Sequence, residues 1–246
     1  MAKTNILSIV IPVFNEEKYI LKTILQVLKS NSLKFKKEII IIDDGSTDNT
    51  YHQIKKYIRS IKYIKNKPIV KLIKKLRNEG KGAALKTGIL NSSGDIILIQ
   101  DADLEYSPDD YPVLLEPFIK NDADVVYGSR FISQKPHRAL YFWHFLGNLF
   151  LTTLSNAFTN INLTDMETGF KVFKKSIIGK LVKKLKSNRF GFEPEITAKI
   201  SKIKDIKIYE VGISYWGRTY KEGKKINWKD GVKTIWQIIK FNLFSK

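Results

Sequence analysis

The sequence predicts an α/β protein with a mostly parallel central sheet flanked by helices, folded as a single domain. Short apolar runs rich in Ile and Val alternate with helical patterns through the first half of the chain. Such alternation requires right-handed crossovers between parallel strands. The chain has 246 residues, of which 43% are hydrophobic, and this is enough to bury one large core.

The expected elements follow one another at regular spacing. Each strand is a short apolar run, and each helix repeats apolar residues every three to four positions, as at Ile20, Ile24 and Val27. The predicted strands are Ile6–Ile11, Glu38–Ile42, Ile69–Ile73, Ile96–Ile99 and Val125–Tyr127. The predicted helices are Glu17–Lys29, Asn49–Arg59, Lys81–Leu90 and Asp109–Lys120. After Phe131 the helices are expected to be longer and richer in aromatic residues.

Composition excludes several classes of protein. The absence of Cys rules out disulfide scaffolds and Cys-based metal or redox sites, and it fits a reducing cytoplasm. The hydrophobic content rules out a disordered chain. The net charge of +19 favours an anionic partner, namely a nucleic acid, a membrane surface or a phosphorylated substrate. A Lys-rich surface that only keeps the protein solvated is the alternative.

No segment reads as a signal peptide or a membrane span. The first apolar run is too short for a signal peptide and lacks a cleavage site. The stretch from Ala139 to Thr164 has no charged residue, but polar residues such as His144 and Asn148 interrupt it. A span needs about 20 predominantly apolar residues. We therefore expect a buried or surface-lying helix there.

Acidic residues follow three of the predicted strands. Asp43 and Asp44 follow the second strand, Asp101 and Asp103 follow the fourth, and Glu16 lies shortly after the first. The carboxyl ends of parallel strands meet at one crevice, where ligands bind. Alternate carboxylates on an extended segment repel one another unless a cation lies between them, so Asp101 and Asp103 indicate a site for Mg²⁺ or Mn²⁺.

A second anion signal precedes the third helix. Gly80, Lys81 and Gly82 open this helix, where free backbone N–H groups favour anions. The spacing is not that of a Walker loop, and no G-x-G-x-x-G follows the first strand. A plain helix start remains the alternative for this motif.

Six motifs spread over about the first 225 residues occur in a characteristic order. They are Pro12-Val13-Phe14-Asn15-Glu16, Asp43-Asp44-Gly45-Ser46, Asp101-Ala102-Asp103, Gly128-Ser129-Arg130, Asp165-Met166-Glu167-Thr168-Gly169-Phe170-Lys171 and Arg218 with Lys225. Taken together, they resemble family 2 glycosyltransferases of the GT-A fold, in the branch of dolichyl-phosphate mannose synthases and polyprenyl-phosphate glucosyltransferases.

The resemblance implies roles for individual residues. Pro12, Phe14, Glu16, Ile42 and Asp44 would line the nucleoside pocket, with Asp43 adjacent. Lys81, from the helix start described above, is a further candidate for binding the nucleotide-sugar. Asp101, Ala102 and Asp103 match the family's D-x-D motif, and Glu105 stands where relatives place a third cation ligand. Arg130 would contact the sugar or phosphates. Arg218 and Lys225 would close over the phosphates, with Lys224 as the alternative because one extra residue separates the pair.

Two acceptors remain open at this stage. A sugar hydroxyl must lose a proton, and Asp165 is the carboxylate available as a general base. A polyprenyl phosphate is already anionic, so Asp165 would then orient a substrate; capping of a turn is its structural alternative. His144 and Asn148 lie on one helical face, where relatives contact the acceptor phosphate, although packing also explains them.

The C-terminal tail predicts an amphipathic helix. Apolar residues share one face and Lys residues lie off it; the apolar residues are Trp228, Val232, Ile235, Trp236, Ile239 and Leu243. Such a helix lies in a membrane interface or docks on the domain. Many relatives append transmembrane helices, whereas this chain ends at Lys246, so we expect peripheral attachment at the cytoplasmic inner face, with a separate membrane-anchoring protein as one means.

The expected organisation is a catalytic domain over 1–213, with a nucleotide-sugar and metal half (1–130) and an acceptor half (131–213), followed by a closing loop and helix over 214–246. The leading hypothesis is transfer of a hexose from GDP-mannose or UDP-glucose to a polyprenyl or dolichyl phosphate, with inversion. The alternatives are transfer to a saccharide hydroxyl in cell-wall or polysaccharide assembly, and a basic nucleic-acid-binding domain. Acids in the crevice repel nucleic-acid phosphates and argue against the last.

Overall fold

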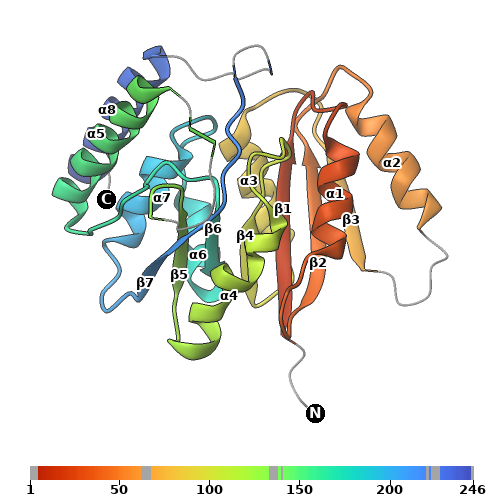
Figure 1. Ribbon diagram of the computed structural model, residues 1–246, viewed down its shortest axis with the longest axis horizontal. Helices are drawn as coiled ribbons and strands as arrows, with labels where there is room; N and C mark the ends of the chain where they lie inside the picture. Colours follow the sequence, from red (N-terminus) through yellow and green to blue (C-terminus); the bar gives the residue numbers. More distant parts are fainter. Residues whose placement is uncertain are drawn as a thin grey trace.

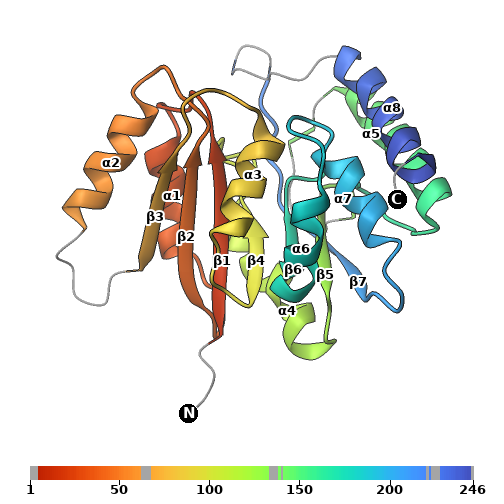
Figure 2. The same ribbon diagram turned by 180° about the vertical axis from the view of Figure 1, so that it is seen from behind.

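The computed structural model describes residues 5–61, 68–132, 138–139, 141–219, 222 and 228–244. One seven-stranded sheet runs through the molecule, and helices cover both of its faces (Figures 1 and 2). The strands are β1 (Ile6–Val13), β2 (Lys36–Asp43), β3 (Ile69–Lys74), β4 (Ile96–Ile99), β5 (Val125–Ser129), β6 (Lys171–Lys174) and β7 (Ile208–Gly212). The helices are α1 (Ile20–Lys29), α2 (Thr50–Ser60), α3 (Lys81–Leu90), α4 (Tyr111–Lys120), α5 (Phe142–Thr159), α6 (Lys175–Leu181), α7 (Phe192–Ile200) and α8 (Trp228–Leu243), with 3₁₀ turns at Pro108–Asp110 and Val182–Lys184.

The strand order is β3-β2-β1-β4-β6-β5-β7. β1, β2, β3 and β4 are parallel, and β5 pairs in parallel with β7. β6 is antiparallel to both β4 and β5. The predicted α/β class and mostly parallel sheet are confirmed, and β6 is the exception.

Two apolar cores hold the layers together. On one face of the sheet, Leu7, Ile9 and Ile11 of β1 pack with α1 and α4. On the other face, Val10 of β1 and Ile40 of β2 pack with α3, α6 and α7. Alternation along β1 sends successive side chains to opposite faces, and both faces are buried, so the strand reads as a continuous apolar run.

All five predicted strands and all four predicted helices are present; Lys81–Leu90 and Ile96–Ile99 match at both ends, and the others differ at one end or both. α1 begins at Ile20 instead of Glu17, because the backbone N–H groups of Tyr19 and Ile20 both donate to the Glu16 carbonyl and form a turn. The strands β6 and β7 were not predicted. β6 is only four residues long and carries Lys at both ends, so it lacks the apolar run that marks the other strands.

Helices α5 and α8 lie side by side beyond the β7 end of the sheet (Figure 1). α5 is formed by the uncharged stretch, and α8 packs against both α5 and α7. Among the described residues, no helix combines the length and the apolar character that crossing a membrane requires.

Candidate functional site

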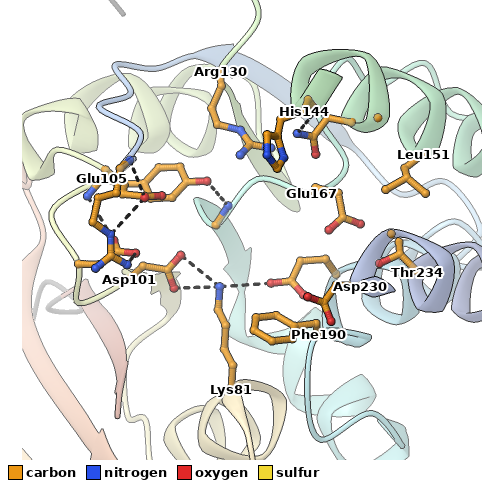
Figure 3. A pocket seen from close by; sticks show the side chains of 18 of the residues that line it. Lys81, Asp101, Glu105, Arg130, His144, Leu151, Glu167, Phe190, Asp230 and Thr234 are labelled. Carbon is orange, nitrogen blue, oxygen red and sulfur yellow. Dashed lines mark hydrogen bonds and ion pairs between the residues drawn. The ribbon is translucent and has the colours of Figure 1, made fainter. Parts of the chain in front are cut away.

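A cleft of about 1510 Å³ lies at the carboxyl ends of the parallel strands and extends to α5 and α8. The loops after β1 and β4 and the start of α3 line one end. Residues of α5 and α8 line the other end, and Figure 3 shows His144 and Thr234 across the cleft from Lys81 and Asp101. The volume exceeds that of a typical single-ligand pocket, about 300–1,000 Å³, so two substrates can meet here.

The three acids predicted to hold a cation lie together after β4, and basic side chains neutralise them. Lys81 Nζ lies 2.9 Å from Asp101 Oδ1. Arg218 contacts both of the others, with Nη2 2.8 Å from Asp103 Oδ2 and Nε 3.3 Å from Glu105 Oε1. Two cationic side chains therefore occupy the acidic end of the cleft.

Among the described residues, no three acidic or histidine side chains are arranged around one point as a preformed metal site. The three carboxylates do not converge because Arg218 pairs with Asp103 and Glu105, while Lys81 pairs with Asp101. The carboxylates nevertheless crowd one another. Burial, followed by the charges of Asp101 and Glu105, raises the pKa of Asp103 to about 7 despite Arg218. A divalent cation would relieve this repulsion, and the oxygen donors suit Mg²⁺ or Mn²⁺.

The expected nucleoside pocket is brought together in part. Pro12, Phe14, Glu16, Asp44 and Ala102 line the cleft. Ile42 and Asp43 do not line it, because both are fully buried beneath it.

The position of Ile42 corrects the expectation drawn from the resemblance. Its side chain points from β2 into the core formed with α3, where it faces Gly88. The Asp43 carboxylate accepts a hydrogen bond from the Ser46 backbone N–H at 3.2 Å. Asp43 therefore shapes the turn after β2 through one of its oxygens.

Asp44 joins the turn after β2 to the start of α3. Its carboxylate accepts hydrogen bonds from the backbone N–H groups of Glu79 (3.2 Å) and Gly80 (2.7 Å), and Lys75 Nζ lies 2.9 Å away. Gly80 has a φ of +103°, a conformation that L side chains rarely adopt. Asp44 thus fixes the loop from which Lys81 reaches the acidic end of the cleft.

Arg130 and Asp165 form a bidentate ion pair. Arg130 Nε and Nη2 lie 2.6 Å and 2.7 Å from the two oxygens of Asp165, and the Arg130 backbone N–H also donates to Oδ2 at 3.1 Å. Asp165 is fully buried. Burial alone would lower the pKa of Arg130, but the charge of Asp165 raises this pKa well above its ordinary value. Both oxygens of Asp165 are therefore engaged in this structure.

The segment after Asp165 packs tightly against the acids that follow β4. A Cβ atom on Gly169 would collide with the Asp101 carboxylate and with the Tyr106 ring. The Gly169 backbone N–H donates to the Tyr106 hydroxyl at 2.9 Å. Glycine is required here by the close approach, which holds the Asp165 segment beside the D-x-D loop.

His144 and Asn148 lie on the side of α5 that lines the cleft. The Asn148 amide donates to the His144 carbonyl at 3.0 Å. The predicted shared face is confirmed, and the face borders the end of the cleft away from the acids (Figure 3). Lys224 and Lys225 lie outside the described residues.

Sequence reasoning left two acids of the cleft without a role. Glu193 lies 3.3 Å from Lys81 Nζ, and Glu167 lines the cleft between the two ends (Figure 3). Glu193 lies in the first turn of α7, where the helix dipole alone favours an acid, so its place in the sequence carries no specific signal. Glu167 lies two residues after Asp165 in a quoted motif, and this spacing was the available signal.

The face predicted for α8 differs from the face that docks. Thr234, Ile238 and Phe241 are buried against the domain. Val232, Trp236 and Leu243, from the predicted apolar face, are more than half exposed, at 57%, 56% and 59%. The helix therefore docks by the side that carries Thr234, Ile238 and Phe241 and presents Trp236 outward.

Comparison with known proteins agrees with this architecture. The model of glycosyl transferase family 2 matches residues 8–182. The UDP-N-acetylglucosamine–dolichyl-phosphate N-acetylglucosaminyltransferase of Methanococcus voltae is 29% identical over 240 residues, covering 94% of each chain. A dolichyl-phosphate beta-glucosyltransferase of Trichomonas vaginalis is 31% identical over 252 residues, covering 98% of this chain and 74% of that one.

Solved structures show the same fold. Glucosyl-3-phosphoglycerate synthase from Mycobacterium tuberculosis, in complex with UDP, superposes with a TM-score of 0.71 at 17% identity, covering 96% of this chain and 80% of that one. Its complex with Mn²⁺, UDP and phosphoglyceric acid gives 0.70 at 18% identity, covering 97% and 79%. The expected GT-A fold is confirmed. Because the family match spans most of the chain and the relatives align along nearly all of it, the chain belongs to glycosyl transferase family 2.

Proposed function

We propose that this glycosyltransferase moves a hexose from a nucleotide-sugar to a polyprenyl phosphate at a membrane surface, with inversion at the anomeric carbon. The observation that carries the proposal is the two-ended cleft. One end holds carboxylates and cationic side chains, and the other is lined by apolar side chains of α5 and α8 such as Phe142, Leu151 and Val232. The names of the relatives, which include a dolichyl-phosphate glucosyltransferase, support the same acceptor class.

Asp101 and Asp103, with Glu105, would hold a divalent cation. The similar glucosyl-3-phosphoglycerate synthase was crystallised with Mn²⁺ or Mg²⁺ together with UDP. When bound, such an ion neutralises charge that builds up on the leaving diphosphate. The crowding of the carboxylates and the hard oxygen donors make this chain fit that ion.

The basic side chains of the cleft supply the remaining stabilisation. Lys81 and Arg218 now pair with the carboxylates, so their charges lie at the acidic end before any substrate arrives. On binding, both would exchange carboxylate partners for diphosphate oxygens. Preorganised cations aimed at developing negative charge lower the barrier most when the site is closed to water. Lys225 or Lys224 would complete this set.

Asp165 would act as an orienting group. A general base needs an oxygen within reach of the proton that it removes. Both Asp165 oxygens contact Arg130 instead, which favours an acceptor that needs no deprotonation, such as a phosphate. Arg130, held in this way, would contact the donor sugar or phosphates, and His144 and Asn148 would lie near the acceptor phosphate.

The apolar end of the cleft would meet the membrane. α5 exposes Phe142 (63%), Trp143 (77%) and Phe150 (55%) beside the exposed face of α8. Large exposed apolar surfaces mark interaction sites, and the net charge of +19 suits anionic lipid. We infer peripheral attachment at the cytoplasmic face, aided by a separate anchoring protein if the surface alone is too weak. In this scheme 1–213 is catalytic and 214–246 closes the donor site and docks.

The test is transfer of radiolabelled hexose from UDP-glucose or GDP-mannose to a short polyprenyl phosphate, with Mn²⁺. The expected product partitions into organic solvent and is released by mild acid, because the sugar is joined through a phosphodiester. A water-soluble glycoside formed on a saccharide acceptor, without lipid product, would overturn the acceptor assignment.

A further inference from the structure

The cleft contains a carboxylate oxygen that has no hydrogen-bond partner in the described part of the chain. Buried side-chain oxygens of this kind occur there in three residues, Asp43, Glu167 and Gln237. Of these, Glu167 is the one that lines the cleft. Its Oε1 atom is shielded from solvent and accepts no hydrogen bond from any residue that the structure describes. A buried acceptor that is left unpaired destabilises the folded state, and a charged one does so more strongly, so this arrangement is not explained by stability.

The cationic groups near Glu167 are committed elsewhere. Lys171 is buried, and its ammonium donates to the backbone carbonyls of Met166 (2.9 Å) and Thr168 (2.5 Å). Arg130 is paired with Asp165, and Lys81 with Asp101 and Glu193. Lys171 therefore fixes the backbone on both sides of Glu167. The Glu167 side chain itself lines the cleft. Burial, followed by the nearby Glu193 charge, raises the pKa of Glu167 to about 7.

Glu167 lies between the two ends of the cleft. Figure 3 shows its carboxyl group between Lys81 and Asp101 on one side and His144 and Thr234 on the other. If the diphosphate lies at the acidic end and the acceptor phosphate near α5, as in the proposed function, the hexose being transferred lies in between. Sugar hydroxyl groups are the donors that such a position would offer to a carboxylate.

We propose that Glu167 is a specificity residue for the donor sugar, whose carboxylate accepts hydrogen bonds from hydroxyl groups of the hexose. This inference rests on the proposed function, because it requires a nucleotide-sugar in the cleft. A site that uses a buried polar group to bind a substrate hydroxyl discriminates strongly against analogues that lack it, since the group is then left unpaired. Glu167 would thus contribute to the choice of sugar, while the nucleotide is bound elsewhere.

The experiment compares binding of a nucleotide with binding of its sugar conjugate. UDP, UDP-glucose, GDP and GDP-mannose are titrated by calorimetry with Mn²⁺ into the wild type, Glu167→Gln and Glu167→Ala. We expect the affinity for the nucleotide alone to stay within about twofold, and the affinity for the matching nucleotide-sugar to fall about 10- to 100-fold, as for loss of one hydrogen bond to a charged group. Glu116→Gln, the same substitution on the exposed side of α4, is the matched control and should change neither value.

Deoxy analogues of the preferred donor identify the contact. The analogue that lacks the contacted hydroxyl should bind the wild type weakly, yet bind Glu167→Gln about as well as the parent sugar does. Such non-additivity is the signature of a direct interaction. The melting temperature separates this role from a structural one: Glu167→Gln should melt no lower than the wild type, because the wild-type oxygen has no partner to lose.

The outcomes are distinct. If Glu167→Gln and Glu167→Ala keep the wild-type ratio of nucleotide-sugar to nucleotide affinity, the specificity role is wrong while the proposed function stands. If the wild type binds none of the four nucleotides, the proposed function fails and this inference fails with it.

Discussion

Arg218 Nη2 lies 2.8 Å from Asp103 Oδ2, which ties the segment after β7 to the loop after β4 across the mouth of the cleft. The same guanidinium reaches Glu105 at 3.3 Å and Glu16 at 3.6 Å. Burial alone would lower the pKa of Arg218, but these carboxylates raise this pKa above its ordinary value. A cation that binds Asp103 must therefore compete with a side chain of the protein.

This competition predicts opposite effects of Arg218→Ala on two ligands. Affinity for Mn²⁺ without nucleotide should rise about 5- to 10-fold, because a charge-assisted contact no longer has to be broken. Affinity for UDP or GDP in saturating Mn²⁺ should fall by a similar factor, because a phosphate contact is lost. Calorimetry measures both, and Arg59→Ala on the exposed side of α2 is the control for the lost charge. Weaker Mn²⁺ binding in Arg218→Ala would contradict the prediction.

Asp103→Asn should abolish metal-dependent nucleotide binding and transfer, since a cation ligand is lost. The fold should be retained. The ionised carboxylate of Asp103 is destabilised by burial and by the charges of Asp101 and Glu105, so its neutralisation costs the fold little. Arg218 keeps its contacts with Glu16 and Glu105 in the variant. Far-UV circular dichroism and urea unfolding check the fold, and equilibrium dialysis with Mn²⁺ checks the metal. Undiminished turnover would remove Asp103 from the cation site.

Asp165→Asn tests the ion pair with Arg130. It leaves a buried guanidinium without its counter-charge, so the free energy of unfolding should drop by about 3–5 kcal/mol. Nucleotide affinity should stay near that of the wild type, because Asp165 is fully buried and Arg130 keeps its charge in the variant. Transfer to a polyprenyl phosphate should fall, but by less than the roughly 10²–10⁴-fold loss typical of a missing general base.

The pH dependence of transfer separates the two roles of Asp165. A general base would give the wild type an acidic limb in kcat that Asp165→Asn lacks. With an orienting group, the two profiles have the same shape and differ only in height. If the wild type shows an acidic limb that the variant lacks, Asp165 is a general base and the acceptor is a hydroxyl group.

The buried carboxylate of Glu38, on β2 between β1 and β3, is expected to control stability in acid. Glu38 accepts hydrogen bonds from Ser8 Oγ (2.5 Å), Ser93 N (2.8 Å) and Lys71 Nζ (2.7 Å). Burial alone would raise its pKa, but the Lys71 ammonium and the serine hydrogen bonds lower the pKa from 4.5 to about 2. Because the folded state binds the proton less readily than the unfolded state, protonation favours unfolding.

The expected stabilisation by Glu38 is about 2–3 kcal/mol near neutral pH. It is complete above pH 4.5 and is lost as the pH falls toward 2. Urea unfolding of Glu38→Gln should therefore show a deficit at pH 7 that shrinks at pH 3. Glu116→Gln again serves as the control. A deficit that does not change between these pH values would show that the pKa is not lowered on folding.

Much of the fold followed from the sequence, because buried parallel strands read as unbroken Ile and Val runs. β6 and β7 were not predicted, because their positions depend on the strands with which they pair and because β7 is only partly buried.

In the functional site, the acidic residues that follow the strands predicted the position of the cleft. Ile42 was misplaced because sequence order does not reveal which face of β2 a side chain joins. Asp103 pairs with Arg218, and Asp165 pairs with Arg130. The paired residues are too far apart in the sequence for their spacing to reveal these contacts.

The last prediction concerns the exposed faces of α5 and α8. Trp143 and Trp236 are 77% and 56% exposed on neighbouring helices, and Lys233 lies on the exposed surface of α8. The double variant Trp143→Gln, Trp236→Gln should keep the melting temperature of the wild type, because neither side chain is buried. Its binding to vesicles that contain anionic lipid should weaken, and so should transfer to a long-chain acceptor, while transfer to a short acceptor phosphate is retained.

The matched control lies on the docked side of the same helix. Ile238 is fully buried, so Ile238→Ala should cost about 2–5 kcal/mol of stability and damage transfer to both acceptors together. Vesicle co-sedimentation over a salt series completes the test, since each Lys near the surface contributes about 1 kcal/mol and salt screens that attraction. If the wild type does not sediment with anionic vesicles at low salt, α5 and α8 do not meet lipid directly, and a separate membrane protein must hold the enzyme near its acceptor.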